Sequence, residues 1–197
     1  FSGRSHLKRK KEKMILDKLP LTIEETQKEL LNGRFSCVDL VDTYLDNINK
    51  HNKELNIFLT VTDDIAYEKA KDRDQFIRDN KDAFKQKPLL GVVVAYKDLF
   101  LTKGVRTTAS SKVLENFIPA YSATSVKRID EAGGIMIGKT NNDAWGHGSS
   151  GENSDFGPTK NPWNKDYVPG GSSSGPAAAL AANMALISTG TDTGSSV

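Results

Sequence analysis

The sequence predicts an α/β fold, and two apolar segments with a helix between them support that prediction. Residues 89–98 (LLGVVVAYKD) have the composition of a buried strand that ends in charge, and residues 133–138 (GGIMIG) that of a second buried strand. Between them, residues 121–132 have the spacing of an amphipathic helix. Strand, helix and strand in this order predict an α/β unit whose sheet is largely covered.

Two further helices are predicted before this α/β unit, over residues 21–50. Thr22 and Glu25 can form a capping box for the first helix, and Ser36 can cap the second. The remaining expectations are a strand over 54–62, a polar helix over 63–82, a turn at 86–88 and a small-residue helix over 176–187 with Pro176 in its first turn.

Length and cysteine content limit the class of protein. The chain of 197 residues is long enough for one sizeable core. Its single cysteine, Cys37, excludes an internal disulfide and favours a reducing compartment. No apolar run approaches the roughly 18 residues of a membrane span, and the basic N-terminal residues are not followed by the apolar stretch typical of a signal peptide. We expect a cytoplasmic protein without membrane contact, or one of an organellar matrix if the source is eukaryotic.

The basic character of the chain is confined to its first residues. Residues 1–13 carry six Lys or Arg and one Glu, so the rest of the chain has a net charge of −3. A basic arm can bind nucleic acid, but no basic face continues it here. We therefore expect residues 1–13 to be a disordered leader, with Met14 as a candidate natural start.

Residues 140–176 are rich in Gly, Asn, Ser and Pro and show no periodicity. A loop of this length in a compact domain is usually functional or disordered. Its aromatic residues give it surface to bury and argue against disorder: Trp145, Phe156, Trp163 and Tyr167. We predict a functional loop.

Residues 133–140 (GGIMIGKT) satisfy the nucleotide-binding pattern G-x-x-x-x-G-K-[ST]. A phosphate loop follows a strand and opens a helix, so that backbone amides point at the phosphates. Here a helix precedes the first glycine, the middle of the pattern favours a strand, and no helical run follows Thr140. We therefore reject nucleotide binding at this segment.

Two serine clusters flanked by glycine are candidates for nucleophilic chemistry, GGSSSGPAAA at 170–179 and GTDTGSSV at 190–197. Backbone amides in such segments can stabilise an oxyanion, and a serine nucleophile needs a base. The candidate bases are His147 and Lys97. Five of the six residues before Lys97 are apolar, and burial favours the neutral form of a lysine.

These two clusters and GVVVAYKD, in this order, resemble the amidase signature hydrolases. Intervening segments such as IGKTNND and GSSGENSDFGPTKNPW are similar to the A-type subunits of the aspartyl/glutamyl-tRNA amidotransferases. The resemblance covers residues 21–197. It implies an α/β/α sandwich with a mixed sheet covered by helices. It also implies that residues 14–197 are the N-terminal part of a single amidase domain that ends just after the nucleophile.

The resemblance implies a triad of two serines and a lysine. Lys97 matches the base, Ser172 the bridging serine in a cis peptide, and Ser196 the nucleophile. Neutral Lys97 would draw the proton of Ser172, Ser172 that of Ser196, and Ser196 would attack the amide carbon. The implied oxyanion hole consists of the backbone amides of Thr193, Gly194, Ser195 and Ser196. The implied substrate pocket includes Gly146, Gly148, Ser149, Ser150 and Ser173.

The implied activity is that of a glutaminase. Glutamine would release ammonia, which B-type and C-type partner subunits would use to amidate Glu or Asp misacylated on tRNA. The chain itself would hold no metal or cofactor, and ATP and Mg²⁺ would serve the partner subunit. Three alternatives stay open: a stand-alone amidase for small amides, an inactive scaffold, and a Ser/His/Asp hydrolase using His147 and Asp192.

The sequence departs from the family pattern at three positions and at its end. Ser174 and Ser195 stand where the family has glycine, and Pro176 where the A-type subunits commonly have serine. A side chain at 195 could crowd the oxyanion hole or forbid a positive φ. The chain ends one residue after Ser196. We therefore expect these 197 residues to be inactive by themselves or to be part of a longer protein.

Overall fold

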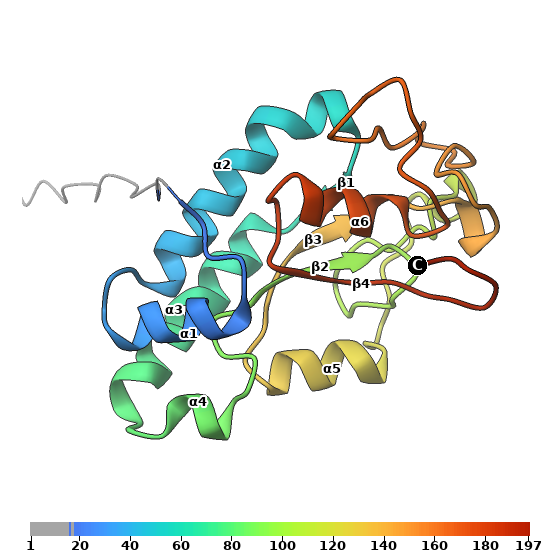
Figure 1. Cartoon of the computed structure of the whole chain (residues 1–197). Coiled ribbons are helices and arrows are strands. Elements are labelled where there is room, and N and C mark those ends of the chain that lie inside the picture. The colour runs from blue at the N-terminus through green and yellow to red at the C-terminus, as the bar shows by residue number, and fades with distance from the viewer. Residues whose placement is uncertain (1–15, 17) are drawn as a thin grey trace, which may run out of the picture.

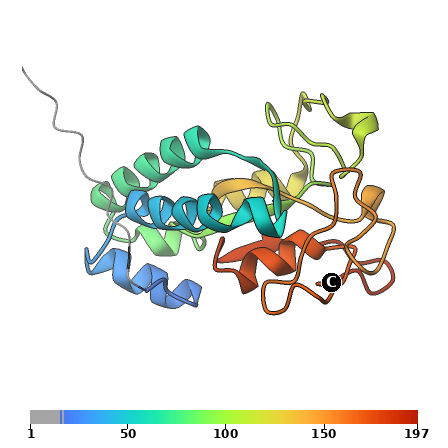
Figure 2. The ribbon, with the colours of Figure 1, turned by 90° about the horizontal axis from the view of Figure 1, so that it is seen from above.

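The computed structural model describes residue 16 and residues 18–197, which form one mixed sheet with helices on both faces (Figures 1 and 2). The predicted leader, residues 1–13, lies outside the described residues. The sheet order is β1-β3-β2-β4. Strand β2 is parallel to β3 and β4, and β1 is antiparallel to β3. The predicted α/β class with a mixed sheet is confirmed. The strands are β1 Phe58–Val61, β2 Val93–Lys97, β3 Ile135–Thr140 and β4 Ile187–Thr189.

The helices pack on the sheet from two sides. Helices α2 and α3 and the alanine-rich α6 lie on one face, and α5 lies on the other (Figure 1). No helix among the described residues is long and apolar enough to cross a membrane. The helices are α1 Ile23–Leu31, α2 Cys37–Leu55, α3 Asp63–Asp79, α4 Ala83–Gln86, α5 Thr124–Glu131 and α6 Ser174–Ala181, with 3-10 turns η1 Lys112–Leu114 and η2 Ala144–Gly146.

Strand β2 separates two hydrophobic cores. Successive side chains of a strand point to opposite faces of the sheet. Val93 and Ala95 therefore belong to the larger core with α2 and α6, while Val94 and Tyr96 belong to the smaller core with α5. By the same alternation, Lys97 follows Ala95 onto the side of α6. All five residues of β2 are buried.

Several predicted boundaries are wrong. The helix predicted over 176–187 ends at Ala181, because the chain turns at Asn183 (φ 52°) and returns to the sheet as β4. The strand predicted over 54–62 begins only at Phe58, because α2 continues to Leu55 and Asn56 (φ 52°) ends it. Residue 86, predicted as part of a turn, is the last residue of α4.

The two predicted helix caps differ in their completeness. Ser36 and Asp39 form a capping box, each side chain accepting from the other's backbone amide. Thr22 accepts from the Glu25 amide, but the Glu25 carboxylate accepts from the Leu21 amide rather than from that of Thr22. Only one half of the capping box predicted at Thr22 is therefore present.

Residues 133–140 form a strand rather than a phosphate loop. Strand β3 includes Lys139, whose ammonium group is completely buried and lies 3.2 Å from an Asp98 oxygen. The glycines of the pattern serve packing. A Cβ on Gly138 would lie 2.5 Å from the Thr60 carbonyl oxygen of β1, and one on Gly133 would lie 2.7 Å from Leu90 Cα.

Candidate active site

Lys97 is the last residue of β2, and its side chain is completely buried. Its Nζ donates to three hydroxyl groups that come from two other segments. The acceptors are Ser172 Oγ at 2.7 Å, Ser173 Oγ at 2.9 Å and Thr191 Oγ1 at 2.7 Å. The structure thus brings Lys97 into contact with the first serine cluster and with the segment after β4.

Burial lowers the pKa of Lys97 from the ordinary lysine value of 10.5 to about 8. The carboxylates of Asp143 and Asp192 act in the opposite direction and limit that decrease. Among the described residues, no carboxylate forms an ion pair with Lys97. A buried lysine surrounded by hydroxyls can lose its proton near neutral pH and act as a base.

Ser172 lies between the glycine-rich loop and the start of α6. It is completely buried, and the Gly171–Ser172 peptide bond is cis. The Ser172 carbonyl oxygen accepts from the Asp143 amide at 3.1 Å. A Cβ on Gly171 would lie 2.2 Å from Asp143 Oδ2, so only glycine fits before Ser172.

Ser196 lies beside the first serine cluster although it comes from the segment after β4. Its carbonyl oxygen accepts from the Ser173 amide at 3.1 Å, and its own amide donates to Asp192 Oδ1 at 3.0 Å. Its side chain is 8% exposed and lines a cavity. Within the described part of the chain, no hydrogen bond joins the hydroxyls of Ser172 and Ser196.

The predicted oxyanion donors differ in their availability. In the described structure, the amides of Thr193, Gly194 and Ser195 have no hydrogen-bond partner, whereas the Ser196 amide is used by Asp192. Ser195 has a φ of 68°, in the left-handed region that favours glycine. The side chain at 195 therefore does not prevent the positive φ, although it adopts that conformation at a cost.

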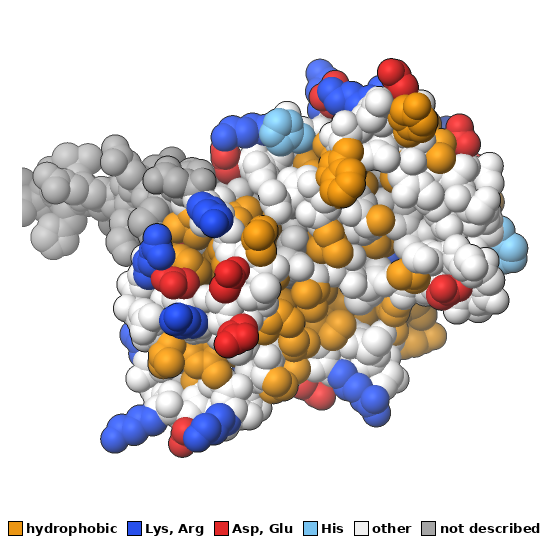
Figure 3. Space-filling view, viewed as in Figure 1, with side chains coloured by type: hydrophobic (Ala, Val, Ile, Leu, Met, Phe, Trp, Pro, Cys, Tyr) orange, Lys and Arg blue, Asp and Glu red, His pale blue; other side chains and the backbone are white. Residues whose placement is uncertain are grey.

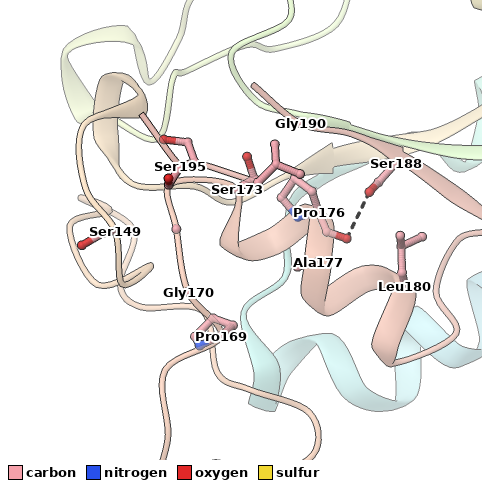
Figure 4. Close-up of a pocket in the computed structure, with 13 residues that line it drawn as sticks. Ser149, Pro169, Gly170, Ser173, Pro176, Ala177, Leu180, Ser188, Gly190 and Ser195 are labelled. Carbon is pink, nitrogen blue, oxygen red and sulfur yellow. Dashed lines mark hydrogen bonds between the residues drawn. The ribbon is translucent and has the colours of Figure 1, made fainter. Parts of the chain in front are cut away.

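A cavity of about 530 Å³ opens beside these serines (Figure 4). Of the predicted pocket residues, Ser149 and Ser173 line it, whereas Gly146, Gly148 and Ser150 do not. None of the lining residues has a charged side chain. The others are Pro169, Gly170, Gly171, Pro176, Ala177, Leu180, Ser188, Gly190, Ser195, Ser196 and Val197.

The structure accommodates Ser174 and Pro176, two residues expected from the sequence to depart from the family pattern. Ser174 is the first residue of α6, is completely buried and has no positive φ. Gly151 makes room for it, because a Cβ on Gly151 would lie 2.5 Å from Ser174 Cβ. Pro176 is in the first turn of α6, where a missing amide is tolerated.

His147 does not take part in this cluster. It is exposed, and its Nδ1 lies 3.0 Å from the Trp145 carbonyl oxygen. No hydrogen bond or ion pair within the described residues connects it to Asp192 or Ser196. The described part of the chain also contains no group of three or more His, Cys, Asp or Glu side chains that could hold a metal ion.

Sequence reasoning missed two residues of the site, Thr191 and Asp143. Thr191 contacts Lys97 directly, and Asp143 is a completely buried carboxylate that accepts from two loop amides. Each follows a strand that neighbours β2 in the sheet. Polar residues just after the carboxyl ends of parallel strands were the available signal, because such ends meet at one edge.

Known proteins are similar to this chain in sequence and architecture. Residues 39–197 match the Amidase family. The A-type subunit of a glutamyl-tRNA(Gln) amidotransferase from Desulforapulum autotrophicum is 50% identical over 177 residues, which are 90% of this chain and 35% of the relative. The corresponding protein from Pseudomonas aeruginosa is 44% identical over 90% of this chain and 36% of its own length. The chain thus spans about a third of the length of these relatives.

Solved structures of amidases and of a related amidotransferase subunit have a similar fold. The A-type subunit of the glutamyl-tRNA(Gln) amidotransferase from Thermotoga maritima superposes with a TM-score of 0.66 at 36% identity, over 87% of this chain and 34% of its own. The native peptide amidase from Stenotrophomonas maltophilia superposes with a TM-score of 0.79 at 32% identity, over 86% of this chain and 36% of its own. The matched residues include the strand end, both serine clusters and the loop between them, and the chain belongs to the amidase family.

Proposed function

We propose that this chain provides the catalytic serines and lysine of an amide-hydrolysing site. The observation that carries the proposal is the environment of Lys97. Its buried ammonium group contacts Ser172 at 2.7 Å, is surrounded by hydroxyls, and forms no ion pair with any described carboxylate. A lysine in these surroundings is suited to accept a proton rather than to hold a charge.

In this proposal Lys97 is the base, Ser172 transfers the proton and Ser196 is the nucleophile. Ser196 attacks the amide carbon, and its proton passes through Ser172 to neutral Lys97. The oxygen of the tetrahedral intermediate takes hydrogen bonds from the free amides of Thr193, Gly194 and Ser195. The relay then returns the proton to the departing ammonia. For this path, the Ser196 hydroxyl has to approach Ser172 when substrate is bound.

The identity to the A-type subunits of several glutamyl-tRNA(Gln) amidotransferases supports glutamine as the substrate. The longer protein would release ammonia from glutamine and work with B-type and C-type subunits that amidate misacylated tRNA. ATP and Mg²⁺ would be used by the partner, and this chain needs neither for its own step. This assignment applies to a protein that carries the segment, since the chain spans about 35% of the relative's length.

A stand-alone amidase for small amides is the second candidate. The structure of the peptide amidase superposes more closely than that of the Thermotoga amidotransferase protein, with TM-scores of 0.79 and 0.66. The cavity beside Ser196 is lined by hydroxyls and apolar side chains, and none of its described lining residues has a charged side chain. A small neutral amide would fit that chemistry.

The test uses a chimera in which residues 21–197 replace the matching segment of the Desulforapulum relative. Ammonia release is measured with glutamine and with small amides as substrates. We expect the chimera to hydrolyse amides. Ser196→Ala, Ser172→Ala and Lys97→Ala should each lower the rate of ammonia release by about 10³-fold or more, because the loss of any one member of a cooperating catalytic group removes most of the activity. The 197-residue chain by itself is expected to release no ammonia.

Matched controls come from the exposed face of α5. Ser125→Ala and Lys127→Ala remove the same side-chain types without touching the cluster, and we expect unchanged rates. A chimera that loses activity with His147→Ala but keeps it with Lys97→Ala would disprove the proposal. Faster turnover of small amides than of glutamine would favour the second candidate.

A further inference from the structure

Asp143 is a buried carboxylate between the two loops that meet at Ser172. It lies three residues after the end of β3, and its side chain is completely buried. Its Oδ2 accepts from the Gly151 amide at 3.0 Å and its Oδ1 from the Asn153 amide at 2.9 Å. Its own amide donates to the Ser172 carbonyl oxygen at 3.1 Å. One residue thus connects the loop of residues 143–153 to the peptide that carries Ser172.

Two glycines make room for this carboxylate. A Cβ on Gly148 would lie 2.4 Å from Asp143 Cγ, and one on Gly171 would lie 2.2 Å from its Oδ2. Both distances are far shorter than any van der Waals contact. The backbone is therefore packed around Asp143 from both loops, and a longer side chain such as glutamate has no space there.

The charge of Asp143 has no partner of opposite sign in contact with it. Among the described residues it forms no ion pair. Burial of a carboxylate without such a partner is costly, and two backbone hydrogen bonds offset only part of that cost. The nearby group that gains from this charge is Lys97, whose pKa Asp143 raises against the effect of burial.

The other groups facing Lys97 are few. Asp192, in the segment after β4, also raises its pKa. Within the described part of the chain, the Lys97 ammonium group donates hydrogen bonds only to the hydroxyls of Ser172, Ser173 and Thr191. Asp98 follows Lys97 in the chain but pairs with Lys139.

We propose that Asp143 is a positioning residue for Lys97 and Ser172: it fixes the loop of residues 143–153 against the Gly171–Ser172 peptide, whose Ser172 hydroxyl contacts Lys97, and its negative charge acts on Lys97. The inference rests on the proposed function, in which these two groups transfer the proton. A base is most effective when its pKa is close to the working pH. Burial alone would make Lys97 a weak base, and the charge of Asp143 keeps it a stronger one.

The test measures the titration of Lys97 directly, so that it needs no activity. Lysine side chains of the 197-residue chain are labelled with carbon-13, their NMR signals are followed with pH, and Lys97→Met identifies the Lys97 signal. Asp143→Asn removes the charge and keeps the shape. We expect it to lower the pKa of Lys97, because the opposite charge that raises it is removed.

Asp155→Asn is the matched control. Asp155 also holds a loop, accepting from Ser111 Oγ and the Lys112 amide, but it does not act on Lys97. We expect its replacement to leave the Lys97 titration unchanged. Should Asp143→Asn fail to fold, Asp143→Ser removes the charge while keeping a smaller acceptor. A folded Asp143 variant with an unchanged Lys97 pKa would overturn the inference.

A second measurement follows the pH dependence of kcat/KM in the chimera. Asp143→Asn should move the acidic limb to lower pH and reduce the maximal rate, whereas a residue with a purely structural role would reduce the rate without moving the limb. A chimera that keeps full activity with Lys97→Met would refute the proposed function. Failure of the proposed function can be told apart from failure of the inference on Asp143, because the NMR titration would still report whether Asp143 acts on Lys97.

Discussion

At the scale of single residues, two buried lysines differ in the groups that surround their charge. Lys97 and Lys139 are both completely buried, and burial lowers the pKa of each. Lys139 has a carboxylate of Asp98 at 3.2 Å and donates to Thr107 Oγ1 and to the Phe100 carbonyl. Among the described residues, the ammonium group of Lys97 has only hydroxyl partners. The first environment keeps a charge, and the second favours its loss.

The environment of Lys97 predicts how stability depends on pH. The pKa of Lys97 is lowered to about 8 in the folded chain, so between pH 8 and the unfolded value of 10.5 the unfolded chain binds the extra proton. The contribution of Lys97 to stability therefore improves as pH rises through this window. Relative to Lys97→Met, the wild-type free energy of unfolding should increase by about 2 to 3 kcal/mol from roughly pH 7 to pH 10. Urea unfolding at a series of pH values measures it.

Lys139→Met is the comparison for that experiment. It leaves Asp98 buried without its cation and should cost about 3 to 5 kcal/mol near neutral pH. If the difference between wild type and Lys97→Met is independent of pH, the lysine is not held in the environment described.

Ser195 and Ser174 are predicted to differ in their energetic effect. Ser195 has a φ of 68°, whereas Ser174 is a buried helix residue without a positive φ. Ser195→Gly should raise the free energy of unfolding by about 0.5 to 1 kcal/mol, because it relieves the left-handed conformation. Ser174→Gly should lower it by a similar amount, since glycine weakens a helix. Equal effects of both substitutions in urea unfolding would contradict this.

At the scale of elements, strand β3 shows why a motif needs its context. Its segment contains the glycines and the lysine of a nucleotide-binding pattern, yet it lies in the middle of the sheet, between β1 and β2. Gly138 pairs with Val61 of β1, and the small residue lets the β1 backbone come close. The order helix, strand and loop in the sequence already argued against phosphate binding, since the loop does not open a helix.

Gly138→Ala tests this packing role. Its new Cβ would lie 2.5 Å from the Thr60 carbonyl oxygen and 2.7 Å from the Phe58 ring. We expect a loss of about 1 to 3 kcal/mol in the free energy of unfolding, typical of an overpacked site. Gly194→Ala is the control, because nothing lies within 4 Å of its Cβ position. Similar stabilities for the two variants would show that β1 can move away.

At the scale of the whole molecule, the site is an edge where several elements end together. Lys97 ends β2, Asp143 follows β3, Ser172 precedes α6, and Thr191 and Ser196 follow β4. Residues 94 positions apart in the chain meet at this edge because β2 and β4 are parallel neighbours.

Figure 3 shows a band of hydrophobic side chains across the middle of the face that carries β4, with charged groups gathered around it.

The sequence by itself determined the α/β class, the buried strands, the amphipathic helices and the residue types of the site. These follow from local patterns, since apolar periodicity and glycine-flanked serines can be read without knowing what lies across the sheet. Only the tertiary structure decided the strand order, the contacts of Lys97 and the burial of Asp143. Each of these features depends on contacts between segments that are distant in the chain. The end of α6 at Ala181 depends on such contacts as well, because pairing of β4 with β2 outweighs the helix propensity of an alanine-rich run.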